Sequence, residues 1–423
     1  FYIDSKMSFP NRFTPIFLKF LPRLRNIHYD VVIIGGGVMG SSSAYFLKFK
    51  EPSLKIAVVE KDSTYMKASS ALSVSSIRQQ FSCPENINLS RWSYNFLKNI
   101  NRNLFVDGEA QAPDIQLFQS SYMFLASSLE GQKILESNIS VQRKCGVDVE
   151  ILSCNGLLNC YPWLNIDGIV AGSKCNANEG WFDGWSLLHA FRKKATSLGV
   201  DYINGHCTHI NIDSFVSSVQ IMFEKESHIL DCRHMVNAAG PWAGELMQLV
   251  NIHLPVLPRK RYVFVFDCPN GPGRRMPLTV DPTGVYCRPE GSGTLYLAGC
   301  SPCESDEPDC SNLDVNYDYF NEVIWPVLAT RFVGMETLKL KHSWSGFYDY
   351  NTFDQNGIIG PHSDIPNLYF ANGFSGHGIQ QSPAVGNAIS EYIIDGKFSV
   401  IDLHKFRYGR IRENEPIREI NVV

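Results

Sequence analysis

A glycine-rich turn near the start of the chain constrains the fold more than any other feature. Residues 29–34 form a short run rich in Val and Ile, and Gly35, Gly37 and Gly40 follow it in a G-x-G-x-x-G pattern. Small and apolar residues come next, and residues 55–60 (KIAVVE) have the composition of a second strand. The segment therefore predicts a strand–turn–helix–strand unit with parallel strands and a right-handed crossover.

Each glycine of this turn has a physical role in binding a dinucleotide. Gly35 permits the tight turn, Gly37 lets the backbone approach a pyrophosphate, and Gly40 lets the helix pack closely on the strand. The positive end of the helix then faces the phosphates. Glu60 ends the second strand about 20 residues later, where a carboxylate accepts hydrogen bonds from an adenosine ribose and disfavours the 2′-phosphate of NADP.

A second glycine cluster, residues 373–378 (GFSGHG), decides between NAD and FAD. It follows a short predicted strand, residues 368–372, and precedes a helix. A helix N-terminus with glycines suits the negative charge of a reduced isoalloxazine ring. We therefore predict FAD, and an NAD dehydrogenase remains the alternative from outside the flavoproteins.

The remaining pattern predicts helices at the flanks and strands in the middle. Helices are expected over residues 84–100 and 185–198. A third helix is expected to begin with Ser382 as N-cap and Pro383 at the first helical position, and to end at Gly396. Strands are expected over residues 115–126, 261–266 and 294–299.

The length of 423 residues exceeds what one ordinary core supports, so we predict two structural parts. The fold class is α/β, with a discontinuous Rossmann-like FAD-binding domain and an inserted, β-rich α+β substrate domain. The FAD-binding domain comprises residues 29–105, 176–250 and 349–410. The substrate or cap domain comprises residues 106–175 and 251–348.

The first 28 residues differ from the rest of the chain. Apolar residues recur there at helical spacing among the cations Lys6, Arg12, Lys19, Arg23 and Arg25, against the single acid Asp4. A basic, acid-poor, amphipathic leader of this kind indicates a mitochondrial presequence, and a basic arm on a cytosolic protein is the alternative.

Composition excludes several classes of protein. A net charge of −4 is no electrostatic match for nucleic acid. No apolar run reaches the roughly 18 residues needed to span a bilayer, which leaves a peripheral membrane contact open. The twelve cysteines are scattered, which indicates reduced thiols. Cys300, Cys303 and Cys310 lack a second pair, so we interpret them as thiols of a loop and predict no metal ligand.

Several of these segments resemble the D-amino-acid, glycine and sarcosine oxidase family. The resemblance covers nearly everything after residue 29. Its motifs are the first glycine turn, residues 237–242 (NAAGPW), Asp354 with Gly360-Pro361, and residues 373–378. Longer stretches resemble a mitochondrial branch of that family, over residues 65–81, 179–188, 258–263, 348–361 and 373–381.

The resemblance implies both an activity and a setting. The activity would be FAD-dependent oxidation of a C–N bond in a small amine or amino acid. The setting would be the matrix side of the mitochondrial inner membrane, in peripheral association with it. There the protein would help respiratory complex I to assemble, through contacts with its subunits or assembly intermediates. The alternative is a flavin-binding assembly factor without turnover.

We predict two catalytic residues, Arg78 and Tyr348, and the first follows from the resemblance. Arg78 stands where sarcosine oxidases hold the substrate carboxylate, and a guanidinium can clamp a carboxylate with two hydrogen bonds. A structural ion pair is the alternative for Arg78. Tyr348, like Tyr350, would line the substrate side or would only pack in the core.

The chain departs from the family at two positions. Gln380 stands where sarcosine oxidases carry a lysine. Phe347 stands where monomeric sarcosine oxidases link the flavin through a cysteine. The departures imply a non-covalent flavin and put sarcosine in question as the substrate.

The predicted cofactor-binding residues belong to the two glycine turns and to the segments beside them. His377 would contact the flavin or cap its turn. The full set is Gly35, Gly37, Val38, Met39, Gly40, Glu60, Lys61, Ser69, Ser70, Ala239, Gly240, Gly373, Gly376, His377, Gly378 and Ile379.

Overall fold

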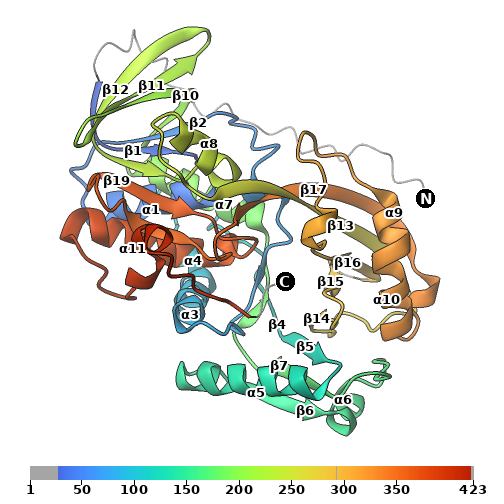
Figure 1. Ribbon diagram of the computed structural model, residues 1–423. Helices are drawn as coiled ribbons and strands as arrows, with labels where there is room; N and C mark the ends of the chain where they lie inside the picture. Colours follow the sequence, from blue (N-terminus) through green and yellow to red (C-terminus); the bar gives the residue numbers. More distant parts are fainter. Residues whose placement is uncertain (1–26, 292, 421–423) are drawn as a thin grey trace.

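A mostly parallel sheet built around the first glycine turn forms one half of the molecule (Figure 1). The computed structural model describes residues 27–291 and 293–420. The predicted leader, residues 1–28, lies outside these ranges except for its last two residues, which begin the first strand. In the described ranges, no helix is both long and apolar enough to cross a membrane.

This first sheet has eight strands, and β1 (Ile27–Ile34) is central. It runs parallel to β2 (Ile56–Glu60) on one side and to β12 (Glu226–Asn237) on the other. β12 also pairs in parallel with β19 (Leu368–Asn372), which brings the strand before the second glycine cluster close to β1. The other strands are β9 (Asp201–Asn204), β10 (His206–Ile212), β11 (Val216–Phe223) and β18 (Ile358–Pro361).

Both faces of β1 are buried, as expected for a central parallel strand. Val31 and Ile33 belong to the core cluster on one face of the sheet, while Val32 and Ile34 belong to the cluster on the other. Each such buried side chain contributes roughly 1.5–3 kcal/mol relative to an exposed one. The strand that leads into the first glycine turn is therefore firmly held.

Two helices that follow the two glycine turns lie side by side, α1 (Val38–Lys50) in blue and α11 (Gly378–Asp395) in red (Figure 1). Their approach depends on Gly386, because a Cβ at that position would strike Ser42 of α1. The Ser42 hydroxyl also donates to the Ser382 carbonyl at 2.8 Å. α3 (Pro84–Lys98) packs on α11, and α7 (Gly184–Ser197) packs on α1. These four helices, from separate parts of the described chain, thus form one helical layer.

The predicted start of the last helix is wrong. α11 begins at Gly378, so Ser382 and Pro383 lie inside it. Pro383 lacks the N–H that would bond to the Ile379 carbonyl, and the Ser382 hydroxyl donates to that carbonyl instead, at 2.9 Å. The helix ends at Gly396 as predicted, with a left-handed φ of 71°.

A second eight-stranded sheet forms the other half, in the order β17-β13-β16-β15-β14-β5-β7-β6. Its strands come from two separated stretches of the chain. They are β5 (Tyr122–Ala126), β6 (Val149–Ser153), β7 (Ala171–Cys175), β13 (Val256–Asp267), β14 (Leu278–Val280), β15 (Tyr286–Glu290), β16 (Leu295–Gly299) and β17 (Lys339–Asn351). A small third sheet holds β3 (Ser76–Ile77), β4 (Phe118–Ser120) and β8 (Glu179–Trp181).

Helices of the second half lie against its sheet (Figure 1). They are α5 (Leu129–Lys144), α6 (Cys154–Cys160) and α10 (Trp325–Arg331). The long strand β17 runs across the predicted boundary at residues 348/349 and returns the chain towards the first sheet. The architecture is the predicted α/β fold with a β-rich insertion, while the exact domain limits stay a prediction.

Candidate functional site

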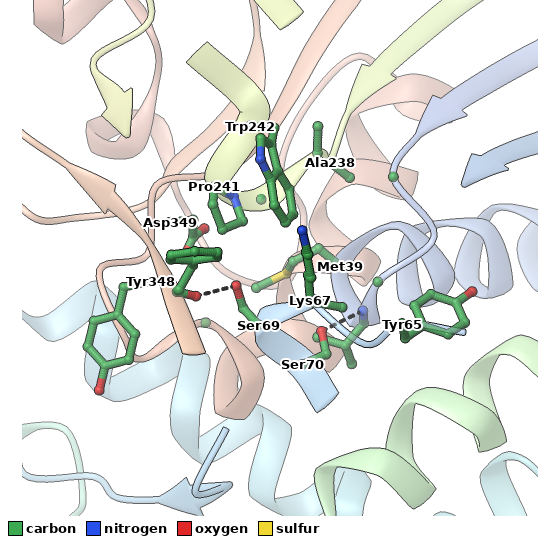
Figure 2. Close-up of a pocket in the computed structure, with 18 of the residues that line it drawn as sticks. Met39, Tyr65, Lys67, Ser69, Ser70, Ala238, Pro241, Trp242, Tyr348 and Asp349 are labelled. Carbon is green, nitrogen blue, oxygen red and sulfur yellow. Dashed lines mark hydrogen bonds between the residues drawn. The ribbon is translucent and has the colours of Figure 1, made fainter. Parts of the chain in front are cut away.

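The two glycine turns meet in one cavity of about 230 Å³. Gly35 and Gly37 line it from the β1–α1 turn, and Gly376 and Gly378 line it from the turn before α11. Strand β17 adds Tyr348, which Figure 2 shows beside the residues of the first half. Segments from opposite ends of the described chain therefore share one binding space.

The β1–α1 turn is packed so tightly that only glycine fits at two of its positions. Gly35 has a φ of 104°, and a Cβ there would strike the Ala238 carbonyl at the end of β12. A Cβ on Gly40 would strike the Gly35 carbonyl. Gly40 does not line the cavity itself. Its missing Cβ lets α1 pack closely on the turn and on β1, which is the role that the sequence predicted for it.

The N-terminus of α1 faces the cavity. No acidic side chain of the helix itself neutralises the partial positive charge of that helix end. The helix has no side-chain cap and no acid in its first turn. A Cβ on Gly37 would meet only the Ser70 hydroxyl, at 3.4 Å. That hydroxyl accepts the Val38 N–H at 3.0 Å, as the dashed line in Figure 2 shows. This arrangement suits a pyrophosphate, which helix N-termini attract.

Glu60 is held at the edge of the same cavity. One carboxylate oxygen accepts the Gly36 N–H at 2.8 Å and the other accepts the Asp62 N–H at 2.9 Å. Burial raises the pKa of Glu60, and these two N–H donors oppose that effect. Each carboxylate oxygen keeps a second lone pair, so Glu60 is fixed where it can accept a ribose hydroxyl.

Trp242 and two lysines, Lys61 and Lys67, line the same cavity. The Lys61 ammonium lies 3.4 Å from the centroid of the Trp242 ring. Figure 2 shows Lys67 reaching towards the same indole. We name Lys61, Lys67 and Trp242 the lysine–tryptophan wall. Sequence reasoning quoted Trp242 within a motif but missed it, and Lys67, as site residues.

Asp349 on β17 fixes the second glycine turn. One oxygen of its carboxylate accepts the N–H groups of both Gly373, at 2.9 Å, and Phe374, at 3.1 Å. Burial raises the pKa of Asp349 to about 6, against the opposing effect of these N–H donors. Gly373 is not a lining residue, contrary to prediction; its φ of 77° forms the turn that Asp349 holds. A Cβ on Gly376 would strike the ring of Tyr348, so this glycine lets the turn lie against β17.

A smaller pocket of about 60 Å³ adjoins the cavity. Tyr286 and Tyr348 line both spaces. The smaller pocket adds Tyr122, Arg78, His377 and Gln380, whose side chains are all buried. The two spaces thus share part of their lining, Tyr348 included, and the smaller one is a polar recess large enough only for a small group.

Arg78 lies in the smaller pocket and not in the main cavity. Its Nη1 donates to the Gln80 carbonyl at 2.5 Å, and its guanidinium lies 3.8 Å from the centroid of the Phe81 ring. Burial lowers the pKa of Arg78, and the carboxylates of Glu419 and Glu179 oppose that effect. The position is suited to an anionic ligand; its role as a carboxylate clamp stays a prediction.

His377 also lies in the smaller pocket rather than in the main cavity. It occupies the N-cap position of α11, but its side chain makes no capping hydrogen bond, so the predicted alternative of a turn cap is wrong. Burial, and then the charge of Arg78, lower the pKa of His377 to about 3. The imidazole is therefore neutral, and it leaves Arg78 as the cation of the recess.

Most of the predicted cofactor-binding residues line the main cavity. These residues are Gly35, Gly37, Val38, Met39, Glu60, Lys61, Ser69, Ser70, Ala239, Gly240, Gly376, Gly378 and Ile379. A Cβ on Gly240 would meet no atom within 4 Å, so the wall is open there. Glu60, a helix N-terminus with no acid in its first turn and a glycine turn all lie at one cavity, and together they fit FAD.

The loop cysteines take no part in this site. Cys300 is buried, Cys310 is half-buried and Cys303 is exposed, each as a free thiol. Within residues 27–291 and 293–420, no cluster of His, Cys, Asp and Glu side chains is suited to a metal ion.

Comparison with protein families gives a match over most of the chain. The family described as FAD dependent oxidoreductase matches residues 30–392. The chain is 47% identical to FAD-dependent oxidoreductase domain-containing protein 1 of Xenopus laevis, over 93% of this chain and 85% of that protein. It is 35% identical to the homologue from Drosophila melanogaster, over 94% of this chain and 81% of that protein.

Solved structures share the fold. L-proline dehydrogenase from P. horikoshii superposes with a TM-score of 0.78 at 23% identity, over 93% of this chain and all of that chain. Glycine oxidase from Geobacillus kaustophilus superposes with a TM-score of 0.74 at 22% identity, over 90% of this chain and 98% of that chain.

Proposed function

The chain belongs to the FAD dependent oxidoreductase family and binds FAD, and from this premise we propose that it oxidises the C–N bond of a small amine that carries a carboxylate. The chemistry that bound FAD would supply is acceptance of a hydride from the carbon next to the substrate nitrogen. The protein's own contribution is to bind and orient that substrate. Amino acids and their N-alkyl derivatives form the proposed substrate class.

The observation that carries this proposal is the continuity of the two spaces. The main cavity holds the residues suited to a dinucleotide, and the recess that adjoins it contains a buried arginine. Tyr348 is among the residues that line both. A substrate whose carboxylate lies beside Arg78 would place its amine-bearing carbon towards the glycine turn at Gly376.

The electrostatics of the recess favour a carboxylate over a second cation. His377 is neutral, because burial and Arg78 lower its pKa to about 3. Burial raises the pKa of Tyr122 to about 12, so that phenol is neutral as well. Arg78 therefore supplies the positive charge of the recess, and the carboxylates of Glu419 and Glu179 act on the same guanidinium. A charged hydrogen bond is strong in such a site of low dielectric.

Visible spectroscopy of the purified protein tests both parts of the proposal. We expect a flavin spectrum, and we expect the pigment to leave the polypeptide on denaturation, because Phe347 offers no thiol for a covalent link. Anaerobic addition of glycine, sarcosine, proline and other amino acids should bleach the flavin with at least one of them. A flavin that no amine or amino acid bleaches would remove the enzymatic function and favour a flavin-binding factor without turnover.

We also propose that the protein acts on the matrix side of the mitochondrial inner membrane and serves the assembly of respiratory complex I. The basic leader and the resemblance of five long segments to a mitochondrial branch of the family support this role. Import into isolated mitochondria, followed by co-isolation with complex I subunits, tests it. Retention of complex I in cells that lack the protein would contradict it.

A further inference from the structure

The C-terminal end of the described chain is docked on the first half of the molecule by buried charges. We name residues 409–420 the C-terminal segment. It begins with α12 (Gly409–Arg412) and lies beyond residue 392, where the family match ends. Its side chains Arg410 and Glu419 are 0% and 8% exposed. Charged side chains are seldom so buried unless they are paired, so their partners show what the segment holds.

Arg410 holds the turn that joins β17 to β18. Its Nε and Nη2 donate to the two carboxylate oxygens of Asp354, at 2.8 and 2.9 Å. Nη2 also donates to the Asn356 carbonyl at 3.0 Å. Removing two charges from water costs about as much as their attraction returns, so a buried ion pair orients its partners more than it stabilises the fold. The guanidinium therefore fixes the orientation of the Asp354 carboxylate.

The same carboxylate is linked by hydrogen bonds to the second glycine turn. Asp354 accepts the side-chain amide of Asn351 at 2.9 Å, and the backbone N–H of Asn351 donates to the Ser375 hydroxyl at 3.0 Å. Ser375 has a left-handed φ of 50°, which a residue with a side chain adopts only when its surroundings hold it there. Gly376 and Gly378, which follow it, line the main cavity. The ion pair is thus connected to the wall of the FAD site.

The far end of the C-terminal segment is fastened at the start of α3. The Glu419 carboxylate accepts the backbone N–H groups of Ser82, at 2.6 Å, and Cys83, at 3.1 Å. α3 has no side-chain cap of its own, so Glu419 supplies one. Asn86 of α3 donates both to Glu419, at 3.1 Å, and to the Asn356 side chain, at 2.8 Å. Both ends of the segment therefore hold the β17–β18 turn.

We propose that the C-terminal segment holds the second glycine turn in the conformation that binds FAD, with Arg410 as the positioning residue. Arg410 lines neither space and acts through Asp354 and the residues bonded to it. Docking of the segment and binding of FAD are then coupled, and the coupling acts equally in both directions. The inference concerns the cofactor alone, so it holds whether or not the protein oxidises an amine.

The first test is Arg410→Lys, which keeps the charge but loses the planar fork that holds both oxygens of Asp354. FAD should dissociate about 10-fold faster, as recovery of flavin fluorescence after dilution of the FAD-loaded protein reports. Arg412→Lys is the matched control, because Arg412 belongs to the same helix and pairs with the exposed Asp364. Its rate should change less than about 2-fold. A wild-type rate in folded Arg410→Lys would overturn the proposal.

A double variant separates positioning from a general loosening of the protein. Ser375→Ala removes the acceptor of the Asn351 N–H and should speed FAD dissociation about 5-fold. If Arg410 acts through Ser375, the double variant should lose FAD about 10-fold faster than the wild type, whereas independent effects would multiply to about 50-fold. The lower value supports the route through the turn, and the higher value rejects it.

Two further measurements keep the inference testable if Arg410→Lys does not fold. Glu419→Gln keeps the shape and the ion pair of Arg410 but brings an amide donor to the N–H groups at α3, so FAD should dissociate about 3-fold faster. In the wild type, the amides of Ile417 and Ile420 donate to Asp354 and Ser82. Their hydrogen exchange should be about 10-fold slower with FAD bound than after its removal. Equal exchange in the two forms would show that the segment and the cofactor are not coupled.

Discussion

The two ends of the binding site are built in different ways. At the nucleotide end, the β1–α1 turn and Glu60 come from one short stretch of chain and act largely through backbone groups. At the proposed substrate end, Arg78, Tyr122, Tyr348 and Gln380 come from distant segments and line the smaller pocket with side chains. The first kind of site depends on the absence of side chains, and the second depends on their orientation. Substitutions at the nucleotide end should therefore reduce FAD binding, whereas substitutions at the other end should weaken binding of a carboxylate and leave FAD bound.

The largest effect is expected at the nucleotide end, from Gly40→Ala. The new Cβ would strike the Gly35 carbonyl. Because this carbonyl is part of the backbone, it can move away only if the whole glycine turn is displaced. We expect roughly 3 kcal/mol of destabilisation and near-complete loss of bound FAD, measured as flavin absorbance per chain. Gly293→Ala is the control, because a Cβ there meets no atom within 4 Å. Full FAD occupancy in Gly40→Ala would show that close helix packing is not needed for this site.

At the substrate end, Arg78→Lys should separate the two regions. Lysine keeps the positive charge but loses the planar fork, so acetate should bind about 100-fold more weakly. FAD should stay bound, since Arg78 does not line the main cavity. Titration of the flavin absorbance with acetate measures the first effect, and the FAD content measures the second. Loss of FAD together with acetate binding would mean that the two ends are not independent.

The strand that links the two ends should show a pH effect of intermediate size. Burial raises the pKa of Asp349 from 3.8 to about 6, so the folded protein holds this proton more tightly than the unfolded chain does. Asp349 therefore stabilises the fold below about pH 4, and that contribution is lost as the pH rises through about 6. The lost stability amounts to at most about 3 kcal/mol.

The variant Asp349→Asn cannot ionise, while its amide oxygen can still accept from Gly373 and Phe374. Its unfolding free energy, from urea titrations at pH 4, 5 and 6, should fall less with pH than that of the wild type. Burial also raises the pKa of Glu179, to about 7, and that group causes a decline of the same sign in both proteins. Equal slopes for the two proteins would contradict the assignment to Asp349.

The smallest effect is expected at the lysine–tryptophan wall. Lys61→Met removes the ammonium that lies over Trp242 but keeps an apolar side chain of similar length. An exposed cation–π contact contributes about 0.5–1 kcal/mol, so FAD should dissociate about 3-fold faster. Recovery of flavin fluorescence after dilution gives the rate. An unchanged rate would show that this wall does not hold the cofactor in place.

The features that the sequence determined are those that act locally. The glycine turn of β1 and α1, the acid at Glu60 and the α/β class follow from hydrophobic periodicity and from positions where only glycine fits. The prediction of FAD is confirmed. It was possible because the residues that bind the pyrophosphate of a dinucleotide lie in one continuous stretch of backbone. The left-handed end of α11 at Gly396 was also predictable, since a helix stop depends on one residue.

Tertiary structure alone decided the side-chain half of the site. No local pattern shows that Asp349 accepts the N–H groups of Gly373 and Phe374, or that Gln380 is oriented by Arg78 and Ser90. Local pattern also misled at Ser382 and Pro383, where a serine hydroxyl lets the helix continue through the proline. These contacts join positions far apart in the chain or replace a backbone bond, and their effects depend on burial. Burial exists only once the two sheets and the helical layer have packed.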